Sequence, residues 1–436
     1  MAYSRYDVSE MQREIAPEIY GNLDLDSVPE RFRAEIGDDP LEGVARAVNP
    51  ESLRKYLQDR DEVDLYRQLT LMGDPIVDAF AVKAQTLGFK KSREMLEQAL
   101  DHGIESVPDA PEELVALIQD MEKIPDWLDF KKIDRYFYRT RMMSTILTEP
   151  LIRMGFMMTY VNGYQGLPMI MTGTLSRESA AKRIKETTST LRMATLPGAL
   201  RRDGVAFRSA AMVRVMHAMV RMNMLKNKKK WDFDVYGVPI PQVDQMGASL
   251  LQNYFTAITS HKLKKPFTRN QKDSIDAWRY LAYLLGLHDY FLSDDREEIL
   301  KTWSMLTATL RGKFDPRARD LNLATLYAYT RPGNSLWDKF MHTLDVKNTR
   351  FLYSKLIVGE RTAKKMGVEV KNSDALATVA MAGIVASKIS VLTLVSVLPG
   401  GKKWVDDWAI NETLRQLDML GDAEYKTEEA SYSMGK

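Results

Sequence analysis

Helical periodicity runs through most of this 436-residue chain and limits it to a helical fold. Apolar side chains recur at three- and four-residue intervals in residues 61–88, 111–124 and 276–292, whereas the alternating pattern of strands is sparse. Short segments with Gly and Pro separate these stretches, and none is long or polar enough to divide the chain. The sequence therefore predicts an all-α fold, with a loosely packed N-terminal arm (1–40), a large single-domain helical bundle (41–420) and a polar tail (421–436).

Composition removes several classes of function. The chain has no cysteine, which excludes disulfides, thiolate zinc sites, iron–sulfur clusters and cysteine nucleophiles. Lysine and arginine total 61 against 59 acidic residues, so the net charge of +2 lacks the basic surplus typical of nucleic-acid binding. We therefore expect no nucleic-acid partner.

The histidines do not form a familiar metal motif. The chain has five of them: His102, His217, His261, His288 and His342. None has a glutamate three residues before it, as the helices of di-iron carboxylate bundles do, and no HExxH zinc motif occurs. GxSxG, Walker-type and GxGxxG sequences are also absent, so common enzyme signatures assign no activity.

The compartment is predicted from two segments. The first twenty residues lack the basic and apolar regions of a signal peptide, so we expect a cytoplasmic protein. Residues Ala375–Pro399 just reach the ~20 residues that a membrane span needs, but Lys388 interrupts them. A buried helix broken near Lys388 is favoured over a span, and a peripheral contact of 375–399 with a membrane stays open.

His217 lies in a stretch with strong helical character. At about 100° per residue its helix face holds small and apolar residues: Ala206, Ala210, Val213, Val220 and Met224. One interpretation is a core histidine bonded to a carbonyl group. The other is a single axial ligand to haem iron, which needs one neutral imidazole among flat, small neighbours. Arg214 and Arg221 flank this face, either to meet haem propionates or as solvated side chains.

A second helical stretch, residues 176–193, groups polar side chains. Arg183, Glu186, Thr187 and Thr190 share one face by their three- and four-residue spacing. This face is either a functional site or an Arg–Glu pair on a solvated surface, and the pattern fits both.

The sequence resembles the haem-dependent oxygenases that include the rubber-cleaving latex clearing proteins and the endoplasmic-reticulum-bound oxygenase of the mycophenolate pathway. Arg183 precedes Thr187 on one helix, and an R-x-x-H-A block containing His217 follows 34 residues after Arg183. The segments that carry the resemblance lie between residues 125 and 287 and are IPDWLDFKKIDRYF, LPMIMTGTLS, AAKRIKETTSTLRM, AAMVRVMHAMVR, VPIPQVDQMGASLL and DAWRYLAYLLGL.

The resemblance implies a role for each matching residue. His217 would be the proximal ligand of a b-type haem enclosed by the bundle, and Arg183 and Thr187 would lie on the oxygen side. Latex clearing proteins have a lysine before this threonine that ligates the resting iron, whereas this chain has Glu186. A distal threonine of the same proteins corresponds to Ser249. Because the lysine is missing, rubber cleavage itself is not carried over.

We therefore expect a haem b-dependent oxygenase. The implied reaction is dioxygen-dependent oxidation or oxidative cleavage of an unsaturated hydrophobic substrate, isoprenoid or lipid-like. Glu186 would accept or relay a proton if burial raises its pKa. The alternatives are a peroxide-dependent haem oxidase, a non-catalytic haem- or gas-binding protein, and a structural protein in which His217 belongs to the core.

Overall fold

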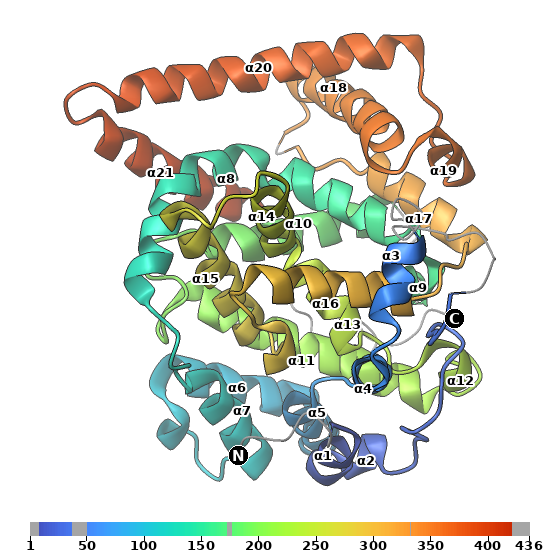
Figure 1. The fold of residues 1–436 in the computed structure, drawn as a ribbon. Helices are drawn as coiled ribbons and strands as arrows, with labels where there is room; N and C mark the ends of the chain where they lie inside the picture. The colour runs from blue at the N-terminus through green and yellow to red at the C-terminus, as the bar shows by residue number, and fades with distance from the viewer. Residues whose placement is uncertain (1–7, 37–49, 172–176, 332, 421–436) are drawn as a thin grey trace. The chain divides into compact units, whose positions relative to one another are not determined.

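The computed structural model describes residues 8–36, 50–171, 177–331 and 333–420 (Figure 1). Within these residues the chain forms helices and no β-strand, and an antiparallel bridge between Phe32 and Leu310 stands isolated. The predicted all-α fold is confirmed. The predicted polar tail, 421–436, lies outside the described residues.

The chain divides into two compact units, each assembled from separate parts of the sequence. Among the described residues, unit 1 comprises those of Met1–Tyr136 and Leu200–Gly312, and unit 2 those of Phe137–Ala199 and Lys313–Glu424. The boundary falls inside α8 (Phe130–Thr159), which begins in unit 1 and ends in unit 2.

The other helices of unit 1 are α1 (Val8–Ile15), α2 (Pro17–Tyr20), α3 (Pro50–Tyr56), α4 (Arg60–Thr70), α5 (Pro75–Leu87), α6 (Phe89–His102), η2 (Ile104–Ser106), α7 (Glu112–Glu122), α11 (Val205–Lys226), α12 (Phe233–Tyr236), α13 (Gln242–Ser249), α14 (Leu251–Lys262), α15 (Arg269–Leu284), η3 (Asp289–Phe291) and α16 (Arg296–Thr309). Those of unit 2 are α9 (Gly163–Met171), α10 (Arg177–Met193), α17 (Pro316–Leu326), α18 (Leu336–Leu352), η4 (Tyr353–Ile357), α19 (Glu360–Lys365), α20 (Asn372–Ser396) and α21 (Gly401–Leu420).

Residues 8–36, within the segment expected to be a loose arm, belong to the core of unit 1. Tyr20 and Leu25 are fully buried. Val8 and Phe32 join the apolar cluster formed with α4, α13 and α16. The guanidinium of Arg31 donates to Asp244 at 2.6 Å. This part of the chain therefore packs like the helices that follow it.

Side-chain caps fix where several helices of unit 1 begin. Thr268 and Gln271 form a reciprocal capping box at the start of α15. Asp295 accepts from the backbone N–H groups of Glu297 and Glu298 at the start of α16. Such caps satisfy backbone donors that have no partner in the first helical turn.

α20 differs from the prediction for residues 375–399. It is one continuous helix, and only 17% of its most apolar 18-residue window is buried, so the expected burial and the expected break near Lys388 are both wrong. Lysine is a good helix former, and the ammonium group of Lys388 lies 5.2 Å from the centre of the Trp408 ring, which lets the charge sit beside the helix. With a mean hydropathy of 1.9, α20 is long and apolar enough to cross a membrane.

Candidate functional site

The helix α10 of unit 2 carries three of the predicted site residues together. Ala180 and Ile184 are buried against Ala324 and Ala328, at and beyond the end of α17, which anchors one side of α10. Arg183, Glu186 and Thr187 are half-buried. Their spacing of three and four residues places these polar groups on one face of the helix. The predicted grouping of the three residues is therefore present.

Arg183 has no hydrogen bond or ion pair within the described residues. Its charge acts on Glu186 and on the phenol of Tyr160, whose pKa it lowers. Tyr160 is only 1% exposed, and burial raises its pKa against the effects of Arg183 and of a hydrogen bond with Thr325. The guanidinium group of Arg183 is thus half-buried, and its hydrogen-bond donors are available to a ligand.

Glu186 has the environment that a proton-transferring carboxyl needs. Burial raises its pKa, and the nearby charges of Lys182 and Arg183 oppose this rise. The Lys182 ammonium lies 3.8 Å from the carboxylate, and its side chain is 52% exposed, so solvent weakens the pair. Desolvation therefore outweighs the two cations.

His217 lies on α11 of unit 1, where a fully buried face meets a half-buried stripe. The stripe consists of Val213, Met216, Val220 and Asn223, and His217 forms its edge. The buried face includes Ala210 and Ala218 and packs α11 against α5 and α15. An imidazole that projects beside small aliphatic groups fits the axial ligand of a flat macrocycle.

Arg214 and Arg221 have carboxylate partners within unit 1. Arg214 donates to Asp74 at 2.7 and 2.9 Å and to Asp120 at 2.8 Å. Arg221 is completely buried, pairs with the completely buried Asp78, and donates to the carbonyl of Pro239 at 3.1 Å. The predicted contact of these arginines with propionates stays a prediction.

One carboxylate of this network, Asp78, has a shifted pKa. Burial raises the pKa of Asp78 to about 6, although Arg221 and a hydrogen bond from Tyr20 favour its ionised form. The neighbouring charge of Asp74 adds to the rise. These carboxylate partners were not among the residues predicted for the site. The signal was present, because Asp74 and Asp78 are four residues apart and Arg214 and Arg221 are seven apart, spacings that place each pair on one helix face.

Two glycines leave space for the network. Gly286 has φ = +79°, and a Cβ there would overlap the Asp74 carboxylate and approach the Arg214 Nε to 2.6 Å. A Cβ on Gly73 would overlap the Tyr20 hydroxyl and come within 2.7 Å of the Arg221 Cδ. The backbone can thus approach the ion pairs this closely only because both positions are glycine.

The remaining predicted residue and histidines lie elsewhere. Ser249 is the half-buried last residue of α13. His261 is exposed beside Glu297 at 3.6 Å, the Nδ1 of His288 accepts from the Tyr290 backbone at 3.2 Å, and His342 packs on the Tyr329 ring. Among the described residues no three His, Asp or Glu side chains gather to hold a metal ion.

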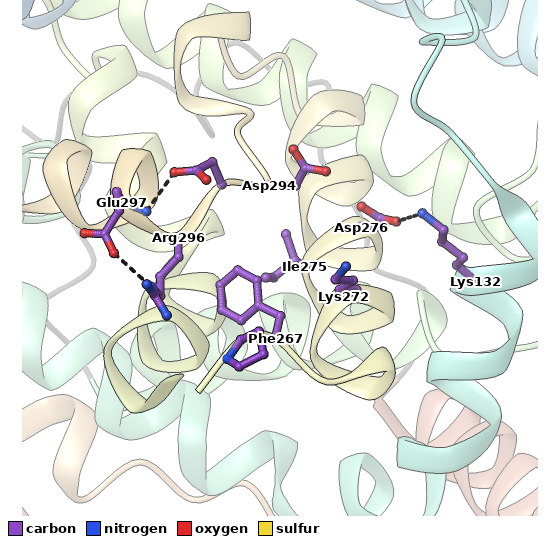
Figure 2. Close-up of a pocket in the computed structure, with 10 residues that line it drawn as sticks. Lys132, Phe267, Lys272, Ile275, Asp276, Asp294, Arg296 and Glu297 are labelled. Carbon is purple, nitrogen blue, oxygen red and sulfur yellow. Dashed lines mark hydrogen bonds and ion pairs between the residues drawn. The ribbon is translucent and has the colours of Figure 1, made fainter. Parts of the chain in front are cut away.

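A pocket of about 530 Å³ opens in unit 1, apart from the predicted residues (Figure 2). Phe267 and Ile275 line it together with charges of both signs. Asp276 accepts from Lys132 at 2.6 Å, and Arg296 pairs with Glu297 at 2.9 Å. Several of the lining charges are thus paired, and none of the residues predicted for the site lines this pocket.

A family model described as ER-bound oxygenase mpaB/B'/rubber oxygenase, catalytic domain, matches residues 149–387, more than half of the chain. The chain belongs to this family and is an oxygenase, an oxidoreductase. The match includes Arg183, Glu186, Thr187, His217 and Ser249, and it extends 100 residues beyond the expected limit of 287.

A solved structure shows the same fold. The chain is similar to the structure of latex clearing protein LCP in the closed state, with a TM-score of 0.53 and 16% sequence identity. The similarity covers 79% of this chain and 91% of the other. A comparison with curated proteins gave no match.

Proposed function

We propose that this protein is a haem b-dependent oxygenase that uses dioxygen to oxidise or cleave an unsaturated hydrophobic substrate, isoprenoid or lipid-like. The family includes rubber oxygenases, and rubber is a hydrophobic polyene, which supports this substrate class. Cleavage of an alkene by dioxygen places one oxygen atom on each of two new carbonyl groups, so it needs no external reductant.

The observation that carries the haem assignment is the place of His217. Within the family region, His217 lies half-buried on the long helix α11, beside Val213, Met216 and Val220. Among the other described histidines of that region, His261 is exposed, the Nδ1 of His288 caps a short helix, and His342 packs on a tyrosine ring. His217 would hold the iron, and the haem would supply the oxygen chemistry.

The polar face of α10 has the groups that the reaction needs from the protein. Arg183 offers a positive charge where negative charge develops on oxygen, an interaction that a low dielectric strengthens. Glu186, whose pKa is raised by burial, would take up or release a proton. Thr187 and Ser249 would orient oxygen or water through their hydroxyl groups.

We also propose that the protein is cytoplasmic and acts on its hydrophobic substrate there. The family description names ER-bound members, which is compatible with an enzyme that works beside a membrane.

The test is the absorption spectrum of the purified protein and of two matched variants. The wild type should show a Soret band, His217→Ala should lose it while keeping its helical circular dichroism, and His261→Ala should keep it. A haem-free wild type, or full haem retention by His217→Ala, would contradict the assignment. Oxygen uptake with an unsaturated lipid then distinguishes an oxygenase from a carrier, and activity that requires added peroxide would indicate the peroxide-dependent alternative.

A further inference from the structure

The exposed side of α20 has an unusual composition for a soluble helix. At about 100° per residue, its exposed large residues fall within an arc of about 140°. They are Leu376, Val379, Ile384, Val391 and Leu394, between 39% and 75% exposed. The other exposed residues in this arc are small, among them Ala380, Gly383, Ser387 and Ser390. This face therefore carries no charge, whereas an ordinary surface helix has its charges on this side.

The opposite side of α20 is held firmly within unit 2. Ala377 and Met381 pack on Met341 and Leu344 of α18, and Figure 1 shows α20 running along this helix. At its start, Asp374 accepts two hydrogen bonds from Arg350, both at 2.6 Å, in a buried pair. α20 is thus anchored to its unit through its first turns and again at Leu392, and its apolar arc is exposed.

Neighbouring helices of unit 2 also expose large apolar side chains. On α18, Trp337 is 64% exposed and its ring lies 5.6 Å from that of Phe340. After α20, Val397, Leu398 and Trp404 are exposed as well. We call the exposed apolar residues of α18, α20 and the start of α21 the apolar plateau. So many exposed large apolar residues within 70 residues of chain indicate an interaction surface.

The segment that carries the plateau has a basic surplus in its sequence. Residues 336–408 contain eleven lysines and arginines against seven acidic residues, a net charge of +4, although the whole chain has only +2. Lys371 precedes α20, and Lys402 and Lys403 follow it. Lys388, at the edge of the arc, extends over the Trp408 ring. Positive charge around an apolar face complements an anionic lipid surface.

We propose that the apolar plateau docks the protein onto the surface of an anionic lipid bilayer, with α20 parallel to the membrane plane. The aliphatic arc enters the acyl boundary, the tryptophans occupy the headgroup level, and the lysines meet anionic headgroups. A second copy of the chain is the weaker candidate, because two like-charged plateaus repel each other and share no polar pairs that would fix their alignment. The proposal does not depend on the haem assignment.

The test is flotation of the full-length protein with vesicles of phosphatidylcholine alone and with added phosphatidylglycerol. We expect binding to the anionic vesicles only. The double variant Leu376→Glu/Val379→Glu should abolish it, and Lys402→Glu/Lys403→Glu should weaken it at least 25-fold, since each lysine near the surface contributes a factor of about five. Leu263→Glu, an equally exposed leucine in unit 1, should bind like the wild type.

Three results would overturn the proposal. Equal binding to neutral vesicles would remove the role of charge. Binding that withstands 1 M salt and alkaline carbonate would mean that α20 is inserted as a span. A wild type that does not float, but forms dimers that Leu376→Glu/Val379→Glu converts to monomers, would make the plateau a protein interface. The Soret band, measured on the same samples, reports the haem assignment separately.

Discussion

The arginines of α11 and of α10 differ in burial and in pairing within their own units. On α11, Arg214 and Arg221 are almost fully buried, and each has carboxylate partners. On α10, Arg183 is half-buried and has no hydrogen bond within the described residues, and Glu186 pairs only loosely. A buried charge without a partner would destabilise the fold, so the α11 arginines need their carboxylates. A half-buried charge tolerates a missing partner and stays available to a ligand.

The largest effect expected from this difference is on stability. Arg221→Ala leaves Asp78 buried without its guanidinium partner and should lower the free energy of unfolding by about 3–5 kcal/mol. Denaturant unfolding of haem-free protein measures this, with Arg60→Ala as control, because the Arg60–Glu35 pair is exposed and should contribute under about 1 kcal/mol. If Arg221 served only a propionate, the haem-free variant would be as stable as the wild type.

The network should also make stability depend on pH. The pKa of Asp78 is raised to about 6 in the folded protein, above its ordinary value of 3.8. Its contribution is therefore fully present below about pH 4 and lost as the pH rises through 6. Unfolding curves between pH 4 and 8 should show this loss in the wild type and not in Asp78→Asn. A parallel slope in both proteins would assign the titration to other groups.

On α10 the expected loss is in turnover. Arg183→Ala removes an electrostatic donor and should lower kcat by about 100- to 1000-fold, or 2.7–4 kcal/mol, with haem content and stability nearly unchanged. Lys182→Ala, the neighbouring and more exposed cation, is the matched control and should retain most activity. Unfolding or haem loss in Arg183→Ala would place this residue with the structural arginines of α11.

The variant Glu186→Gln should affect activity and stability in different ways. Because the folded pKa is raised, the contribution of Glu186 to stability is present at low pH and lost as pH rises through that pKa, so the glutamine variant should be at least as stable at neutral pH. The variant also loses the ion pair with Lys182, which should lower the free energy of unfolding by under about 1 kcal/mol. Activity should fall and lose one limb of its pH profile. An unchanged profile would make Glu186 a surface partner of Lys182.

The smallest effect concerns two adjacent threonines of α10. The hydroxyl of Thr188 is buried and has no partner, whereas Thr187 is on the half-buried face. Thr188→Val should leave turnover unchanged and raise stability by about 1 kcal/mol, since it removes an unsatisfied polar group. Thr187→Val should lower turnover at nearly constant stability. Thermal unfolding and oxygen uptake on both variants decide whether the two faces differ in function.

Periodicity and motifs predicted what depends on local sequence. The all-α fold, the helices that carry Arg183 and His217, and the grouping of Arg183, Glu186 and Thr187 all follow from spacings within one helix. What the sequence did not reveal depends on partners distant along the chain. The carboxylates that pair with Arg214 and Arg221 come from α5 and α7, and an arginine alone does not reveal them.

The predicted burial of α20 was wrong for a similar reason. Apolar composition predicts burial only when enough neighbours cover the helix, and α18 and α21 cover one side. The packing of residues 8–36 was likewise not predicted, because this segment has few apolar residues and they contact α4, α13 and α16, which lie far along the chain.

The split of unit 2 between residues 137–199 and 313–424 has a consequence for how the chain folds. In unit 2, α8 joins α21 through the hydroxyls of Thr145 and Thr413, 3.2 Å apart, and α10 rests on α17. During synthesis, α8 and α10 emerge long before these partners. Closing a long loop adds only about 0.6 kcal/mol for each doubling of its length, but distant contacts slow the search. Unit 2 should therefore fold late, and its early helices should be the segments most exposed to aggregation or chaperones before synthesis ends.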